Sequence, residues 1–290
     1  MVSPYYQVIK GSFVILGKKP DGDSVRFLAD EPGLYENLQR SYRINPSRDR
    51  TVQLRLEGLD TPEVHYGKDA QPQGEEARDR LLKLLGFRDV AYSGDTVSSA
   101  KPDTVAGAIL SQAVEANGRP ISYLVSADEA KSLSNGEWVR VTKNYLQKTL
   151  NFQLLQEGVA YYTVYTSMPL SHREFLQKVT TEARQENRGV WKEDRTREFI
   201  LESQEDLSPP DGQLILPKLF RRCTDYLKAV ERGFRGNLKD WLLANESNSR
   251  SENDRVLLGN VELKLSDLIR QNNNRVVFQP DILDLTFLEK

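Results

Sequence analysis

The stretch R-L-E-G-L-D-T-P-E, residues 55–63, places a guanidinium and spaced carboxylates around the end of an apolar strand. Apolar residues at 52, 54 and 56 alternate with polar ones, which predicts a strand with one buried face. Gly58 interrupts the alternation and indicates a bulge or sharp bend. Such a bend could bring Asp60 to the side of Arg55, although strict alternation places them on opposite faces. These residue types can hold a hard cation against a phosphate, so the stretch indicates phosphodiester chemistry.

Two turns flank this stretch in the sequence. Residues 5–17 contain an apolar run that predicts a strand, and the turn P-D-G-D that follows places Asp23 at the start of a second strand. Asn117-Gly118 is a preferred hairpin turn between strands predicted over 109–114 and 121–125, so Arg119 opens the returning strand. Taken singly, both turns are more often solvated than functional.

Taken together and in this order, D-G-D-S-V at 21–25, R-L-E-G-L-D-T-P-E at 55–63 and N-G-R at 117–119 resemble the staphylococcal nuclease family. The resemblance covers roughly residues 5–193 and continues through Asn151 and the R-G-V-W motif at 188–191. It implies an α+β fold, a five-stranded OB-fold β-barrel with packed helices. Periodicity alone predicts only a mixture of α and β elements.

The resemblance also implies a calcium site and a catalytic set. Asp23 and Asp60, with the carbonyl oxygen of Thr61, would be the metal ligands, an all-oxygen set that suits Ca²⁺. Glu63 would orient or deprotonate the attacking water. The products would carry a 3′-phosphate.

The phosphoryl oxygens would be held by Arg55 and Arg119, whose guanidinium groups can each bind two of them. The sequence departs from the family pattern at Ala116 and Asn117, and Pro120 makes the aim of Arg119 less defined than that of Arg55. Tyrosines 161, 162 and 165 could stack bases, and Tyr165 is the candidate substrate contact, although aromatic residues beside a barrel are more often core.

Several other elements are predicted from patterns. Helices are expected over 74–86, near 150–157, and from a capping box at Ser171 and Glu174 to Gly189, with His172 on the surface. Residues 87–105 are expected to form a loop, and 127–143 an enlarged hairpin loop.

Composition limits the alternatives. With 290 residues, two domains are expected. The net charge of −2 gives no general attraction to a polyanion, so any nucleic-acid contact must be local. Cys223 is the single cysteine and is expected in a core, and two histidines without spaced partners are a poor basis for a zinc site or a serine triad.

The domains are expected at 1–195 for the nuclease-like part, 196–212 for an acidic linker, and 213–290 for a small C-terminal α+β domain of unknown role. This last part contains an apolar helical stripe, a hairpin around Gly259-Asn260 and a strand over 275–278. Basic residues lie elsewhere around its helix, namely Lys218, Arg221, Arg222 and Lys228. Such charge is more often a solvated face than a nucleic-acid contact.

The sequence thus predicts a calcium-dependent nuclease acting on single-stranded DNA, RNA and conceivably duplex DNA. The alternative is a catalytically silent nucleic-acid-binding module or scaffold with the same barrel. A protein partner bound by the C-terminal domain is compatible with either. No membrane segment is expected, and the N-terminal sequence predicts a cytoplasmic protein, where free calcium is scarce, unless the chain is processed and secreted.

Overall fold

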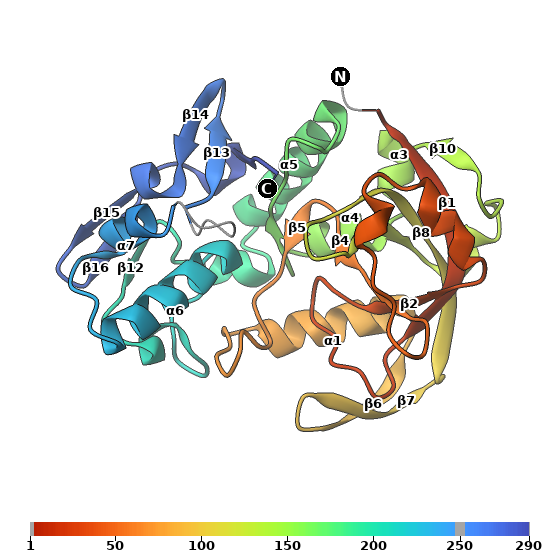
Figure 1. The fold of residues 1–290 in the computed structure, drawn as a ribbon, viewed down its shortest axis with the longest axis horizontal. Coiled ribbons are helices and arrows are strands. Elements are labelled where there is room, and N and C mark those ends of the chain that lie inside the picture. Colours follow the sequence, from red (N-terminus) through yellow and green to blue (C-terminus); the bar gives the residue numbers. More distant parts are fainter. Residues whose placement is uncertain (1–2, 247–252, 290) are drawn as a thin grey trace.

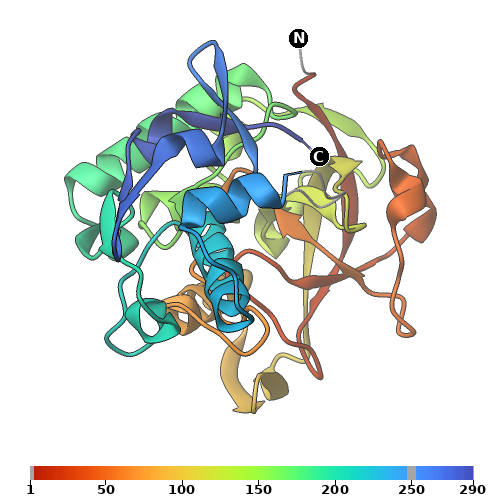
Figure 2. The ribbon, with the colours of Figure 1, turned by 60° about the vertical axis from the view of Figure 1, so that its left-hand side comes forward.

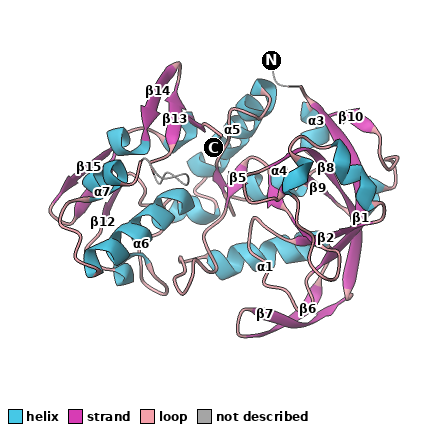
Figure 3. Ribbon diagram, in the orientation of Figure 1, coloured by secondary structure: helices cyan, strands magenta, loops and turns pink. Residues whose placement is uncertain are grey.

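The computed structural model describes residues 3–246 and 253–289. A β-barrel with attached helices forms one half of the molecule, and a smaller C-terminal part lies beside it (Figure 1). Figure 3 shows that both halves mix helices and strands. This confirms the predicted α+β class with a second small α+β part.

The barrel sheet has the order β3-β2-β1-β8-β9-β4, with β10 paired to β1. Its strands are β1 (Tyr5–Val14), β2 (Arg26–Ala29), β3 (Val52–Gln53), β4 (Arg55–Leu56), β8 (Thr104–Val114), β9 (Pro120–Val125) and β10 (Trp138–Arg140). β1 runs antiparallel to β2 and β8, whereas β4 runs parallel to β9.

The sheet closes on itself because its two end strands are consecutive in the chain. Only Leu54 separates β3 from β4, and its N–H donates to the carbonyl of Val25 at 2.9 Å. The Leu54 side chain is fully buried. Counting β3 and β4 as one strand, the barrel consists of that strand with β1, β2, β8 and β9, which confirms the predicted five-stranded barrel.

Helices pack against the barrel and against one another. They are α1 (Gly74–Leu85), α2 (Ala127–Ala130), α3 (Lys143–Leu146), α4 (Leu150–Gln156) and α5 (Leu170–Gln185). Asn151 in α4 is fully buried, donates to the carbonyls of Glu57 and Ser122, and accepts from the N–H of Leu124. One side chain therefore ties α4 to β9 and to the bend that follows β4.

Three local predictions were wrong. Residues 87–105 are not a loop, because β6 (Arg88–Ser93) and β7 (Thr96–Lys101) form a hairpin that projects from the barrel. α5 ends at Gln185 and its N-terminal residue Pro169 makes no side-chain cap, so the predicted capping box is absent there. His172 is buried: its Nε2 donates to the carbonyl of Val141, and its Nδ1 accepts from the hydroxyl of Tyr123.

The segment expected as a linker contains regular structure. β12 (Glu198–Ile200) pairs with β16 (Arg275–Phe278), which also pairs with β15 (Ile269–Asn272). The short η4 helix (Gln204–Leu207) follows it. A second sheet joins β13 (Arg255–Leu258) to β14 (Val261–Lys264) and β17 (Leu285–Phe287).

Two helices complete the C-terminal part, α6 (Pro217–Glu231) and α7 (Leu238–Ala244). The apolar stripe of α6 is buried as predicted, including Cys223, whose thiol pKa burial raises. Figure 2 turns the left-hand side of Figure 1, which contains α6 and α7, toward the viewer. Among the described residues, no helix is long and apolar enough to cross a membrane.

The two parts of the molecule are joined by backbone and side-chain contacts. The N–H of Phe287 donates to the carbonyl of Val164 at 2.9 Å, and the N–H of Thr166 donates to the carbonyl of Phe287 at 2.9 Å. Arg184 of α5 forms a two-pronged ion pair with Asp281 at 2.7 and 2.8 Å. These contacts hold the C-terminal part, through β17 and Asp281, against the segment after β11 and against α5.

Candidate active site

The 55–63 stretch forms a strand, a bend and a second short strand. Gly58 has φ of +84°, and it separates β4 from β5 (Leu59–Asp60), which pairs with β11 (Tyr161–Tyr162). A Cβ at Gly58 would lie 2.8 Å from Cε of Met168. The bend carries Asp60 to the same side as Arg55, as the sequence suggested against strict alternation.

Arg55 bridges two carboxylates that arrive from different elements. Its Nη1 lies 2.9 Å from Oδ2 of Asp23, and its Nη2 lies 3.2 Å from Oδ1 of Asp60. Burial lowers the pKa of Arg55, but Asp23 and Asp60 outweigh it and the pKa is raised. The guanidinium therefore stays charged at any working pH.

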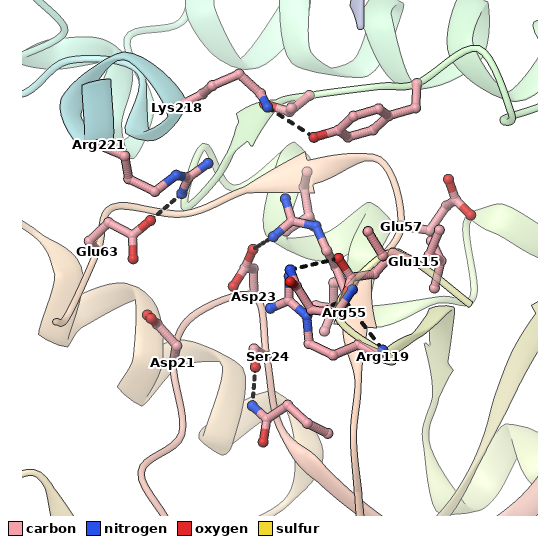
Figure 4. Close-up of a pocket in the computed structure, with 18 of the residues that line it drawn as sticks. Asp21, Asp23, Ser24, Arg55, Glu57, Glu63, Glu115, Arg119, Lys218 and Arg221 are labelled. Carbon is pink, nitrogen blue, oxygen red and sulfur yellow. Dashed lines mark hydrogen bonds and ion pairs between the residues drawn. The ribbon is translucent and has the colours of Figure 1, made fainter. Parts of the chain in front are cut away.

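Asp60 and Glu63 share a second arginine, Arg221, which α6 supplies. Nη2 of Arg221 lies 2.8 Å from Oδ2 of Asp60, and its Nη1 forms an ion pair with Oε1 of Glu63. Figure 4 shows Arg221 reaching from α6 toward Glu63, while Asp23 and Arg55 lie across the cleft. The site is thus built from both parts of the molecule.

Burial and neighbouring charges set the pKa values of these carboxylates. Burial raises the pKa of Asp60, but Arg221 and Arg55 outweigh it and hold that pKa well below its usual value. Burial raises the pKa of Glu63, Arg221 lowers it, and Asp60 and Asp23 raise it again, leaving it at about 6. At neutral pH Glu63 is therefore mostly a carboxylate with a proton affinity suited to general-base chemistry.

Arg119 opens β9 and lines the same cleft. Its Nε lies 3.0 Å from Oε1 of Glu115, and the ion pair fixes the arginine across the hairpin turn. Gly118 of that turn has φ of +84°, as the predicted Asn-Gly turn requires. Arg119 also lowers the pKa of Asp23, although burial, the largest influence, leaves that pKa raised.

The cleft between barrel and α6 has a volume of about 680 Å³. Tyr165 forms part of its wall and accepts a hydrogen bond from Nζ of Lys218 at 3.0 Å. Tyr161 and Tyr162, in contrast, are buried at 0% and 4% exposure and belong to the core. Of the tyrosine cluster, only Tyr165 lines the cleft.

The residues expected to hold a metal were tested against the geometry. Asp23 and Asp60 both face Arg55 and offer only oxygen donors, and Oγ1 of Thr61 is buried without a hydrogen-bond partner among the described residues. Within the described ranges, no three acidic, histidine or cysteine side chains gather as an ion cage. The donors therefore fit a hard cation bound by two carboxylates, with solvent or substrate oxygens completing its shell.

Several cleft residues were not singled out as site residues from the sequence. Asp21 and Glu57 lie within the quoted motifs but had no role assigned to them, and Glu115 lies outside these motifs. Asp21 anchors the turn before Asp23 by accepting from the N–H groups of Gly22 and Val64. Arg221 was visible only as one of four basic residues around a helix, and nothing in its spacing indicated that it reaches the 55–63 stretch.

The geometry defines a class of protein, a closed five-stranded OB-fold barrel with a charged cleft where arginines and carboxylates meet. Residues 53–193 match the family model described as Staphylococcal nuclease homologue. This region of the chain is therefore a domain of the staphylococcal nuclease family. Asp23 and Arg221 lie outside the matched region, and the fold brings them to it.

Two curated proteins are similar to part of the chain. Both are named probable endonuclease LCL3, one from Clavispora lusitaniae and one from Scheffersomyces stipitis, and each is 35% identical over 86 residues. The aligned segment is 28% of this chain and 37% of each relative. The chain therefore matches little more than a third of the length of these relatives.

Proposed function

We propose that this protein is a metal-dependent nuclease that hydrolyses phosphodiester bonds of DNA or RNA, with calcium as the metal and products that carry a 3′-phosphate. The observation that carries the proposal is that Arg55 joins Asp23 to Asp60, and Arg221 joins Asp60 to Glu63, beside a cleft that Arg119 also lines. The family match and the names of the two relatives support it.

In this mechanism, the arginines bind the scissile phosphate. Arg55 and Arg119 turn their guanidinium groups to the non-bridging oxygens and neutralise charge that grows on them as water attacks phosphorus. Glu63 accepts the proton of that water, and its pKa of about 6 keeps it in the basic form at neutral pH. The bond between phosphorus and the 5′-oxygen breaks, the 5′-oxygen takes up a proton from solvent to become a hydroxyl, and the phosphate remains on the 3′-oxygen.

Asp23, Asp60 and the carbonyl oxygen of Thr61 would hold the calcium ion. When bound, the metal supplies Lewis-acid polarisation of the phosphate. Tyr165, on the wall of the cleft, is placed to contact a base or sugar of the strand.

Cleavage of labelled single-stranded DNA, duplex DNA and RNA tests the proposal, with calcium, with magnesium and with chelator. We expect calcium-dependent cutting that falls on the order of 100-fold or more in Glu63→Gln and in Arg55→Lys, because each removes a contact to the transition state. Matched controls are Glu75→Gln and Arg275→Lys, since these side chains are 77% and 59% exposed and remote from the cleft. Binding without cutting in the wild type would favour the scaffold alternative instead.

A further inference from the structure

Arg221 and Arg222 are cleft arginines that come from α6 in the C-terminal part. Arg222 pairs with Asp254 at 2.9 Å, whereas Arg221 reaches the carboxylates of the barrel part. α6 reaches the cleft beside Arg55 and Arg119, which belong to the barrel. Both terminal nitrogens of Arg221 point to carboxylates: Nη2 to Asp60 at 2.8 Å, and Nη1 to Glu63 and to Oδ1 of Asp60 at 3.4 Å. Its side chain is 18% exposed.

These contacts occupy Asp60 on both of its oxygens. Oδ1 also accepts from Arg55 at 3.2 Å, and the side chain of Asp60 is only 1% exposed. A divalent cation that uses Asp60 must therefore take at least one oxygen from an arginine. Arg221 contacts both oxygens of Asp60 and Arg55 contacts only one, so Arg221 competes most directly with an ion bound at Asp60.

α6 itself is fixed to the segment that joins β5 to α1. Nε2 of Gln71 donates to the carbonyl of Ile215 at 2.8 Å just before the helix, and Lys228 near its end pairs with Asp69 at 2.7 Å. Leu219 and Phe220 are fully buried. A change at the site thus requires a new rotamer of Arg221 and no movement of the helix.

We propose that Arg221 is a tethered cation that occupies the metal ligand Asp60 and the base Glu63 in the free protein, and that a divalent ion binds Asp60 only by displacing it. The inference rests on the proposed function. Displacement moves the guanidinium off Asp60 and Glu63 toward the open cleft, where the phosphate of a substrate would provide a new anionic partner. The metal would take Asp60 and release Arg221, and the substrate phosphate would bind the released Arg221. Metal and substrate would therefore each increase the affinity of the protein for the other.

Isothermal titration calorimetry of calcium, without nucleic acid, tests this directly. We expect Arg221→Gln to bind calcium on the order of 10-fold more tightly than the wild type, because a charge-assisted contact of about 1.5 kcal/mol no longer competes. Lys19→Gln is the control for general charge, since Lys19 lines the same cleft but pairs with Asp95 at 3.2 Å. Its calcium affinity should stay within about two-fold of the wild type, by the weakness of screened surface charges.

Circular dichroism establishes that each variant is folded. Arg221→Lys serves as a second variant that keeps the positive charge but loses the planar guanidinium that contacts two carboxylates at once. Its gain in calcium affinity should be smaller than that of Arg221→Gln. Calcium affinity that is unchanged or weaker in the folded Arg221 variants overturns the inference and leaves the proposed function standing. Absence of calcium binding in all variants, together with metal-independent cutting, overturns the calcium dependence of the proposed function and the inference with it.

Discussion

Arg55 shows how a single residue organises the charges of the cleft. It is 14% exposed and contacts Asp23 and Asp60, which are themselves almost fully buried. Isolated buried carboxylates would gain protons, and two of them side by side would do so more strongly. One shared guanidinium, assisted at Asp60 by Arg221, keeps the pair usable as oxygen ligands.

Glu57 differs from Asp60 because no neighbouring cation fully offsets the rise in pKa that burial causes. Its side chain is 6% exposed, and burial together with the carboxylate of Glu289 raises its pKa to about 8, against a smaller opposing effect of Arg55. An unfolded glutamate has a pKa near 4.3. Between those values the unfolded chain loses a proton that the folded chain keeps, so stability falls as pH rises through this window.

Replacement of Glu57 by glutamine should remove that loss. Wild type and Glu57→Gln are expected to have similar free energies of unfolding near pH 4.5, while at pH 8.5 the variant should be more stable by roughly 2 to 4 kcal/mol. Urea unfolding in chelator at both pH values measures this, with Glu36→Gln as a control at an exposed glutamate. A variant no more stable than the wild type at pH 8.5 would show that Glu57 ionises freely in the folded protein.

At the scale of elements, the bend at Gly58 sets the direction of Asp60. A left-handed backbone costs an alanine on the order of 1–2 kcal/mol, and the added methyl group would also displace Met168. We expect Gly58→Ala to lose roughly 2 to 3 kcal/mol of stability. It should also slow cleavage, because β5 shifts and Asp60 no longer meets Arg55.

Gly94 offers a matched comparison for this substitution. It has φ of +56° at the tip of the β6–β7 hairpin, and a Cβ there meets no atom within 4 Å among those described. Gly94→Ala should therefore show only the backbone cost and retain full cleavage activity. Urea unfolding and single-turnover cleavage of both variants separate the two effects; equal rates in the two variants would dissociate the Gly58 bend from catalysis.

Elements that depend on neighbouring residues in the sequence were predictable, whereas features that depend on contacts between distant segments were not. The Asn117-Gly118 turn and helix α1 follow from turn chemistry and from apolar spacing, and both were confirmed. The β6–β7 hairpin was missed because its strands are largely exposed and lack a clear alternation. His172 was misplaced because the contacts that bury it, Tyr123 and Val141, come from other elements.

The same distinction applies to the candidate site. Motif order brought Asp23, Arg55 and Asp60 to attention, and the structure places them in contact. Arg221 lies 161 positions from Asp60 in the chain, and no periodicity carries information over that separation. Only the packing of α6 on the cleft reveals it.

At the scale of the whole molecule, the two parts share an interface that includes backbone pairing, the Arg184–Asp281 ion pair and a buried hydrogen bond from Gln71. Interfaces with exposed, mainly polar contacts allow domains to unfold separately. Here β17 adds its backbone to the segment after β11, and Phe287 is 3% exposed. We therefore expect one cooperative unfolding unit rather than two.

Phe278→Ala tests this cooperativity from a position remote from the barrel. Phe278 is fully buried in β16, so its truncation should cost roughly 3 to 5 kcal/mol. If the parts unfold together, native-state hydrogen exchange of the slowest amides in β1 and β8 should accelerate as much as exchange in β16 itself. Val261→Ala, at a 58% exposed position of β14, should leave both unchanged. Faster exchange confined to the C-terminal part would mean that it opens independently, and then Arg221 would leave the cleft whenever that part unfolds.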